Sequence, residues 1–127
     1  MGRADKRSAG DDTNYARGVR AENQAAQYLE KQGYRILETR YKTKFGEIDL
    51  IVFKGEVLCF VEVKTRNTLS EALESVTPRS QKRIEQSALY FLSEYPEYSD
   101  KGMRFDVVAI TSPFQITHLD NAWEARS

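Results

Sequence analysis

The segment from Gly46 to Arg66, GEIDLIVFKGEVLCFVEVKTR, constrains the fold more than any other part of the sequence. It contains two apolar runs that favour β-strands, joined by a short turn. Three charged residues, Asp49, Glu62 and Lys64, interrupt the face of these strands that points inward. Burying charge in a sheet is costly unless an opposite charge or a metal ion compensates for it. We therefore expect this hairpin to carry a functional site.

The phase of the hairpin decides which of these charged side chains meet. We place a two-residue turn at Lys54 and Gly55. Asp49 then lies opposite Phe60 as a diagonal neighbour of Glu62, with Cβ atoms about 7 Å apart. A four-residue loop keeps this pairing, whereas a three-residue loop breaks it. In the first two cases the two carboxylates can share one cation.

The rest of the chain supplies helices and strands around this hairpin. Thr77 is a typical N-cap, Pro78 suits the first helical position, and Gly33 suits the end of a helix. The expected elements are helices over 15–32 and 78–95, strands over 34–41, 104–110 and 115–119, the hairpin over 46–66, and a loop over 67–75. The order α-β-β-β-α-β, with one further strand, predicts an α/β fold in which helices flank a mixed sheet.

Length and composition limit the domain organisation. At 127 residues the chain can form one domain with a real core, which we place at 15–120, between a mobile tail at 1–14 and a second tail at 121–127. The net charge of zero argues against a non-specific polycation.

Cysteine usage and hydropathy indicate the compartment. The single cysteine, Cys59, excludes a disulfide within the chain, and we expect it to be a small core residue. No stretch is apolar enough to span a membrane, and the N-terminus lacks the apolar segment of a signal peptide. We therefore expect a cytoplasmic protein without a membrane partner.

The charged residues of the hairpin suit the chemistry of a hard divalent cation. Mg²⁺ prefers oxygen ligands and is usually held by one or two carboxylates together with substrate phosphates. Asp49 and Glu62 meet that demand, and the carbonyl of Val63 can add an oxygen. Lys64 is placed to position or deprotonate an attacking water and to stabilise charge on a phosphate. The reaction implied is phosphodiester hydrolysis.

These residues also resemble known motifs. Asp49 followed by Glu62-Val63-Lys64 resembles the PD-(D/E)xK signature of restriction-endonuclease-like nucleases. A wider pattern over residues 16–110 resembles the YraN family of bacterial endonuclease-like proteins. Its matching residues are Gly18, Glu22, Gly33-Tyr34, Gly46-Glu47-Ile48-Asp49, Phe60 to Arg66, and Arg104-Phe105-Asp106-Val107-Val108.

The resemblance carries implications for fold and activity. It implies a restriction-endonuclease-like fold and a Mg²⁺- or Mn²⁺-dependent endonuclease that hydrolyses DNA, with branched or damaged DNA among the candidate substrates. Related small nucleases often work as dimers, so the resemblance also suggests a homodimer.

Two further glutamates are candidates for the site. The resemblance implies that Glu22, on the first helix, approaches the metal; the alternative is an ion pair with Arg20 or Arg66. Glu47 shares a strand face with Asp49 but lies near the start of the strand. Direct ligation by Glu47 therefore competes with simple exposure or an ion pair with an arginine.

Two glutamines compete for a positioning role on the second helix. Gln86 and Tyr90 superficially match a QxxxY motif, but they lie about 200° and 240° from Ile84, away from the apolar stripe. Gln81 lies about 60° from Ile84, so we choose Gln81 as an assisting catalytic residue. The alternative is that Gln81 only bonds local backbone.

Three other residues stand out, and we expect each of them to have a structural role. Asp106 interrupts the apolar run of the final strand, either to support an arginine or the first helix, or to hold a loop; we favour the loop. His118 is the only histidine and has no companions in the sequence, which argues against a zinc site or a catalytic triad. Trp123 either packs on the domain or belongs to the tail.

Basic residues flank the predicted site and can contact phosphates without reading bases. The candidates for contact with nucleic acid, which we expect to be DNA, are Arg17, Lys42, Lys44, Arg66, Arg79 and Lys82. Carboxylates repel DNA until a cation neutralises them, so this binding should depend on metal.

Three hypotheses follow from the sequence. The first is a metal-dependent nuclease. The second is a module that keeps the nuclease fold and binds nucleic acid or a protein without catalysis. The third is a structural component in which the charged residues form a buried ion-pair network.

Overall fold

The computed structural model describes residues 13–112 and 115–125 of the chain. Its helices are α2 (Asn14–Lys31), α3 (Leu69–Glu74) and α4 (Pro78–Glu94), with a short 3₁₀ helix, η1 (Pro96–Tyr98). Its strands are β1 (Arg35–Thr43), β2 (Gly46–Lys54), β3 (Val57–Thr65), β4 (Gly102–Ser112) and β5 (Gln115–Trp123). The predicted restriction-endonuclease-like α/β fold is confirmed, including the second strand after the last helix.

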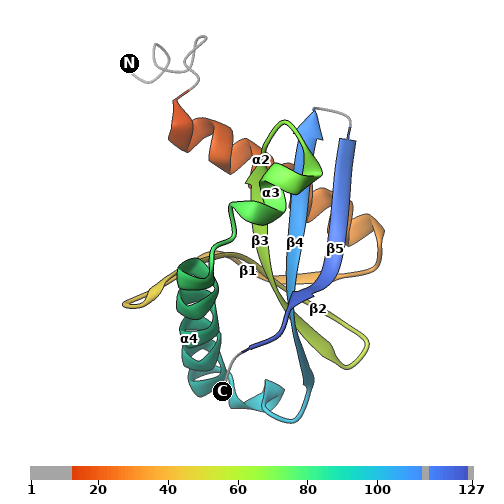
Figure 1. Cartoon of the computed structure of the whole chain (residues 1–127). Helices are drawn as coiled ribbons and strands as arrows, with labels where there is room; N and C mark the ends of the chain where they lie inside the picture. The colour runs from red at the N-terminus through yellow and green to blue at the C-terminus, as the bar shows by residue number, and fades with distance from the viewer. Residues whose placement is uncertain (1–12, 113–114, 126–127) are drawn as a thin grey trace, which may run out of the picture.

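Among the described residues, β1 to β5 form one sheet in the order of the sequence (Figure 1). Every neighbouring pair is antiparallel except β3 and β4, which run parallel. A parallel pair needs a long crossover, and the segment with α3 and α4 provides it. The sheet is therefore mixed, as predicted.

Helices bury both faces of the sheet. On one face Ala25 and Leu29 of α2 pack in a cluster with Cys59 and Val61 of β3. On the other face a second cluster joins the buried side of α4 to Leu58 and Phe60, among others. In the view of Figure 1, α2 passes behind the strands. Burial on two faces explains why β3 is an almost continuous apolar run rather than an alternating one.

The core position of Cys59 is confirmed, since its side chain is fully buried. Burial raises the pKa of the Cys59 thiol to about 12. The thiol is therefore protonated at neutral pH and has little nucleophilic character.

The helix ends follow their capping residues. The hydroxyl of Thr77 accepts a hydrogen bond from the amide of Ser80 at 3.1 Å, with Pro78 in the first turn, as predicted. After α2, Gly33 takes φ +96°, a left-handed conformation typical of glycine at a helix end.

The helix α3 lies where a loop was expected. The hydroxyl of Thr68 accepts a hydrogen bond from the amide of Glu71 at 3.1 Å. This is the Thr-x-x-Glu signature of a helix start, which was present in the sequence. The prediction of a loop over 67–75 was therefore wrong, since this signature begins a short helix.

The hairpin turn lies one residue later than predicted. Lys54 pairs with Val57, so the turn residues are Gly55 and Glu56, and Ile51 rather than Asp49 lies opposite Phe60. The physical reason is Gly55, whose φ of +63° suits the first central position of a two-residue hairpin turn. The register moves by two residues, and an even shift does not by itself exchange the two faces of a strand.

The C-terminal boundary also differs from the expectation. β5 continues to Trp123, beyond the boundary placed at 120. The indole Nε1 of Trp123 donates to Glu85 Oε2 at 3.0 Å, and its ring stacks on Phe105 with centroids 5.2 Å apart. The tail expected at 1–14 lies outside the described residues up to residue 12, and α2 already begins at Asn14.

In the part of the chain that the structure describes, no helix is long and apolar enough to cross a membrane.

Candidate metal site

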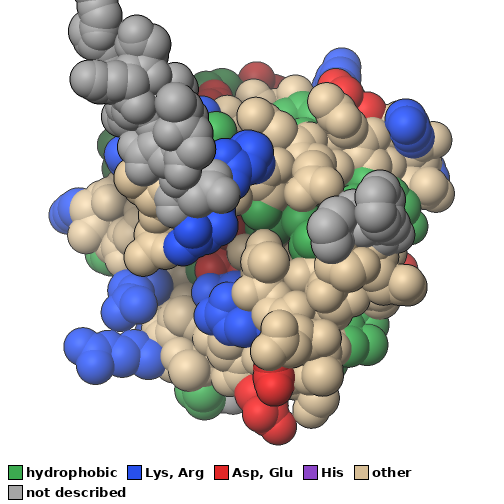
Figure 2. Space-filling model, turned by 90° about the horizontal axis from the view of Figure 1, so that it is seen from above, with side chains coloured by type: hydrophobic (Ala, Val, Ile, Leu, Met, Phe, Trp, Pro, Cys, Tyr) green, Lys and Arg blue, Asp and Glu red, His purple; other side chains and the backbone are tan. Residues whose placement is uncertain are grey.

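A hollow opens where the N-terminal half of α2 faces the ends of β3 and β4. It encloses about 1000 Å³ and is lined by Arg17, Glu22, Asp49, Glu62, Lys64 and Arg66, among others. Seen from above, acidic side chains lie recessed in this region and Lys and Arg side chains surround them (Figure 2). The hollow therefore combines an acidic floor with a basic rim.

Asp49 lies at the centre of the acidic floor. Its Oδ2 accepts a hydrogen bond from the backbone amide of Val63 at 2.8 Å, which ties β2 to β3 beyond their last paired residues. Burial raises the pKa of Asp49 to about 8, and the nearby Glu62 carboxylate adds to this increase. The structure thus brings together the two carboxylates on which the sequence prediction depended.

Glu62 lies beside Asp49 and bonds Lys64. Lys64 Nζ is 3.4 Å from Glu62 Oε2, and the two side chains are 21% and 14% exposed. Burial raises the pKa of Glu62, although Lys64 partly offsets the effect. Within the described residues, Oε1 of Glu62 is a buried oxygen that has no hydrogen-bond partner in the protein. Such an atom is unusual and calls for a ligand or water.

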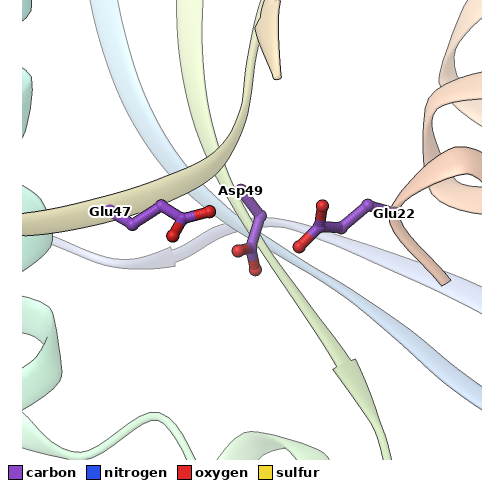
Figure 3. A group of neighbouring side chains, drawn as sticks. All are labelled: Glu22, Glu47 and Asp49. Carbon is purple, nitrogen blue, oxygen red and sulfur yellow. The ribbon is translucent and has the colours of Figure 1, made fainter. Parts of the chain in front are cut away.

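Glu22 and Glu47 approach Asp49 from two other directions. Each of the three side chains offers one carboxylate oxygen, and these oxygens lie within 4.8 Å of one another. The carboxylates of Glu22, from α2, and Glu47, from β2, point toward Asp49 (Figure 3). Glu47 is exposed, whereas Glu22 is largely buried. Asp49 therefore belongs to two groups of carboxylates, the trio with Glu22 and Glu47 and the pair with Glu62.

Arg40 is a residue of the site that the sequence reasoning missed. Its Nη1 donates to Glu22 Oε1 at 3.0 Å, so Glu22 forms an ion pair with an arginine other than the two suggested by the sequence, Arg20 and Arg66. Arg40 lies between Thr39, which pairs with Leu50, and Tyr41, which pairs with Ile48. This register places Arg40 directly across from Asp49, and no pattern in the sequence alone reveals it.

Gln81 is not brought to the site. Its Nε2 donates to the backbone carbonyl of Val76 at 3.1 Å, and neither Gln81 nor Gln86 is among the residues that line the hollow. The alternative stated for Gln81, a bond to local backbone, is what the structure contains. The amide is used to hold the turn before α4.

The basic candidates divide into two groups. Arg17 and Arg66 line the hollow. The other four, Lys42, Lys44, Arg79 and Lys82, are exposed but do not line it. Arg20 also lines the hollow. Because α2 lies along this edge, its exposed arginines reach the hollow, whereas the lysines at the β1–β2 turn do not line it.

Asp106 belongs to a separate buried network. It is fully buried, and its oxygens accept hydrogen bonds from Arg104 at 2.9 Å and from the backbone amide of Asn121 at 3.0 Å. Asp106 and Asn121 both lie within strands, β4 and β5, so the favoured loop role is wrong and the alternative, support of an arginine, is what the structure contains. It also lies 2.8 Å from Nε2 of His118. His118 therefore has a carboxylate neighbour that the sequence did not indicate, because β5 pairs with β4 and brings the two together.

The hydrogen bonds determine the charge of this network. Burial alone would raise the pKa of Asp106, but the bonds from His118 and Arg104 outweigh it and lower the pKa. Asp106 lies on β4 and is not among the residues that line the hollow. Its contacts serve the packing of β4, β5 and Tyr34, whose hydroxyl accepts from Arg104 at 2.8 Å.

The acidic floor has the composition of a site for a hard cation. Four carboxylates, from Glu22, Glu47, Asp49 and Glu62, meet there, and Arg40 and Lys64 form ion pairs with Glu22 and Glu62. All the side-chain donor atoms of the carboxylates are oxygens, which Mg²⁺ and Mn²⁺ prefer. The buried oxygen of Glu62 and the raised pKa of Asp49 both indicate negative charge that the protein compensates incompletely.

Known proteins are similar to this chain over three quarters or more of its length. A UPF0102 protein of Mesorhizobium japonicum is 44% identical over 98% of this chain and 99% of its own length. One of Rhodopseudomonas palustris is 45% identical over 85% of this chain and 83% of its own, and one of Bartonella tribocorum is 47% identical over 76% and 75%. The model of the "Uncharacterised protein family UPF0102" matches residues 21–110, which contain Glu22, Asp49, Glu62 and Lys64. The chain therefore belongs to the UPF0102 family, the YraN family that its motifs resemble.

Proposed function

We propose that this protein is a metal-dependent nuclease that hydrolyses phosphodiester bonds in DNA. The observation that carries the proposal is the convergence of carboxylate oxygens of Glu22, Glu47 and Asp49 within 4.8 Å of one another. Glu62 lies beside them with a buried oxygen that lacks a partner in the described part of the protein. Asp49 would hold a Mg²⁺ or Mn²⁺ ion together with Glu22 or Glu47 on one side, or with Glu62 on the other.

The cation, when bound, supplies Lewis acidity and compensates for the charge that develops on a phosphate. The protein's own groups orient the reaction. The amide of Val63 fixes the rotamer of Asp49 through a 2.8 Å bond, and we propose that the carbonyl of the same residue faces the cation. Lys64, held 3.4 Å from Glu62, is positioned to orient a water or to donate to a phosphate oxygen.

Nucleic acid is the partner that the rim suits. Arg17 and Arg66 line the hollow around the acidic floor, where their guanidinium groups can contact backbone phosphates on both sides of the reacting bond. Phosphate contacts carry no sequence information, so we expect a preference for DNA structure rather than sequence. Two protomers would be needed to cut two strands at once, and light scattering at tens of micromolar tests for a homodimer.

A cleavage assay tests the proposal. Wild-type protein, Asp49→Ala and Lys64→Met are incubated with Mn²⁺ or Mg²⁺ and with single-stranded, duplex, nicked and branched DNA. Asp120→Ala is the matched control, because Asp120 is an exposed carboxylate on β5 that does not line the hollow. We expect cleavage by wild type and the control and a loss of at least 100-fold in both site variants. Equal cleavage by wild type and Asp49→Ala, or none by either on any substrate, contradicts the proposal.

A non-catalytic role is favoured by one observation. Glu22 and Glu62 are already paired with Arg40 and Lys64, as they would be in a structural ion-pair network. In that case Lys64→Met should lower the melting temperature by several degrees, and Mn²⁺ should bind no more tightly to wild type than to Asp49→Ala. Binding of DNA without cleavage would support the module that keeps the fold alone.

A further inference from the structure

Arg40 has an unusual backbone for a residue inside a strand. Its φ is +48°, in the left-handed region that residues other than glycine and asparagine rarely adopt. The residues on both sides of it pair regularly with β2, so the conformation is confined to this position. A strained residue persists only where the surrounding contacts hold it, and such residues concentrate at functional sites.

The contact that holds Arg40 is Glu22. Nη1 of Arg40 lies 3.0 Å from Oε1 of Glu22, and the arginine side chain remains 34% exposed. Glu22 belongs to the trio of carboxylates that face one another within 4.8 Å. The guanidinium therefore already neutralises one of the groups that a divalent cation would use.

We propose that Arg40 is the built-in counter-ion of the acidic site and competes with the divalent cation for Glu22. Without the cation, Arg40 offsets the repulsion among Glu22, Glu47 and Asp49 and keeps the three carboxylates together. With the cation, two positive charges share the same carboxylates, and the attraction of the cation for the site is reduced. Arg40 is thus a positioning residue that preserves the site and limits its affinity for metal. This inference rests on the proposed metal site.

Competition for Glu22 predicts the opposite effect on metal affinity to that of a simple structural ion pair. Removing a structural arginine lowers stability and leaves metal binding equal or weaker, because the carboxylates spread apart. Removing a competing arginine lowers the stability of the metal-free protein but tightens metal binding. Affinity for metal, rather than activity, therefore separates the two roles.

The experiment measures Mn²⁺ affinity by calorimetry and the melting temperature with EDTA, at low ionic strength and pH 8. The variants are Arg40→Met, which removes the charge, and Arg40→Lys, which keeps it. Arg35→Met is the matched control, because Arg35 lies on the same strand but contacts Tyr98 and Phe53 instead. If Arg40→Met does not fold, Arg40→Gln, which keeps an amide donor for Glu22, replaces it.

We expect Arg40→Met to bind Mn²⁺ about tenfold more tightly than wild type and to melt at a lower temperature with EDTA. Arg40→Lys should bind close to the wild-type value, and so should Arg35→Met. If wild type binds Mn²⁺ but Arg40→Met binds equally or more weakly, the counter-ion role is overturned and the metal site stands. If wild type binds no Mn²⁺, the metal site fails and this inference fails with it.

Discussion

Replacing Asp49 by asparagine should stabilise the metal-free protein at high pH. In the folded protein the pKa of Asp49 is about 8, against an ordinary value of 3.8, because of burial and the neighbouring Glu62. Between these two values the folded state keeps a proton that the unfolded state has released. Stability due to this group is therefore fully present below about pH 4 and is lost as the pH rises through 8.

The size of the effect follows from the shift. About four pKa units at about 1.4 kcal/mol each set an upper limit near 6 kcal/mol. Asp49 is only partly buried and Lys64 lies close, so solvent and relaxation reduce the observable loss. We expect the wild type to lose about 2–3 kcal/mol between pH 5.5 and pH 9. The asparagine side chain has no charge to acquire and should lose much less.

Urea unfolding with EDTA at both pH values measures the difference, and Asp120→Asn controls for the loss of an exposed carboxylate on β5. Addition of Mn²⁺ in excess over EDTA at pH 9 should restore most of the stability of the wild type but should not stabilise Asp49→Asn further, because metal binding favours the ionised site. Parallel pH profiles for wild type and Asp49→Asn would refute the reasoning, since they would mean that Asp49 does not carry the buried charge.

Three further outcomes follow from the structure. Asp106→Asn should cost about 3–5 kcal/mol in urea unfolding at pH 7, because it leaves Arg104 and His118 without their buried carboxylate partner; a loss below about 1 kcal/mol would mean that the network is not important for stability. Cys59 should react with a thiol reagent only on unfolding, since its thiol is buried with a pKa of about 12, and rapid labelling of the native protein would contradict this. Gln81→Ala should leave Mn²⁺ affinity unchanged in calorimetry, because its amide bonds Val76; a weaker affinity would place it in the site after all.

Local patterns were sufficient to predict most of the fold. Apolar runs, Thr77 with Pro78, and Gly33 each act within a few residues, so helices and strands followed from the sequence. The turn at Gly55 was misplaced by one residue because glycine suits either of the two central positions of a hairpin turn. The error did not matter for the site, since a shift of two residues in register preserves the faces of Asp49 and Glu62.

The rest of the site depends on contacts between distant segments. The pairing of β1 with β2 brings Arg40 across from Asp49, and no periodicity within β1 encodes that register. In the same way, the position of His118 beside Asp106 depends on the pairing of β4 with β5. The contact of Gln81 with Val76 could not be predicted, because a helical wheel gives the direction of a side chain but not the backbone carbonyl that it meets.

A crystal soaked in Mn²⁺ tests the central claim most directly. The account predicts one strong anomalous peak in the hollow, within about 2.0–2.3 Å of an Asp49 oxygen and of at least one oxygen from Glu22, Glu47 or Glu62. The same soak of Asp49→Asn should lose the peak. A wild-type crystal without a peak at Asp49, or with Mn²⁺ bound only at other carboxylates, would contradict the account.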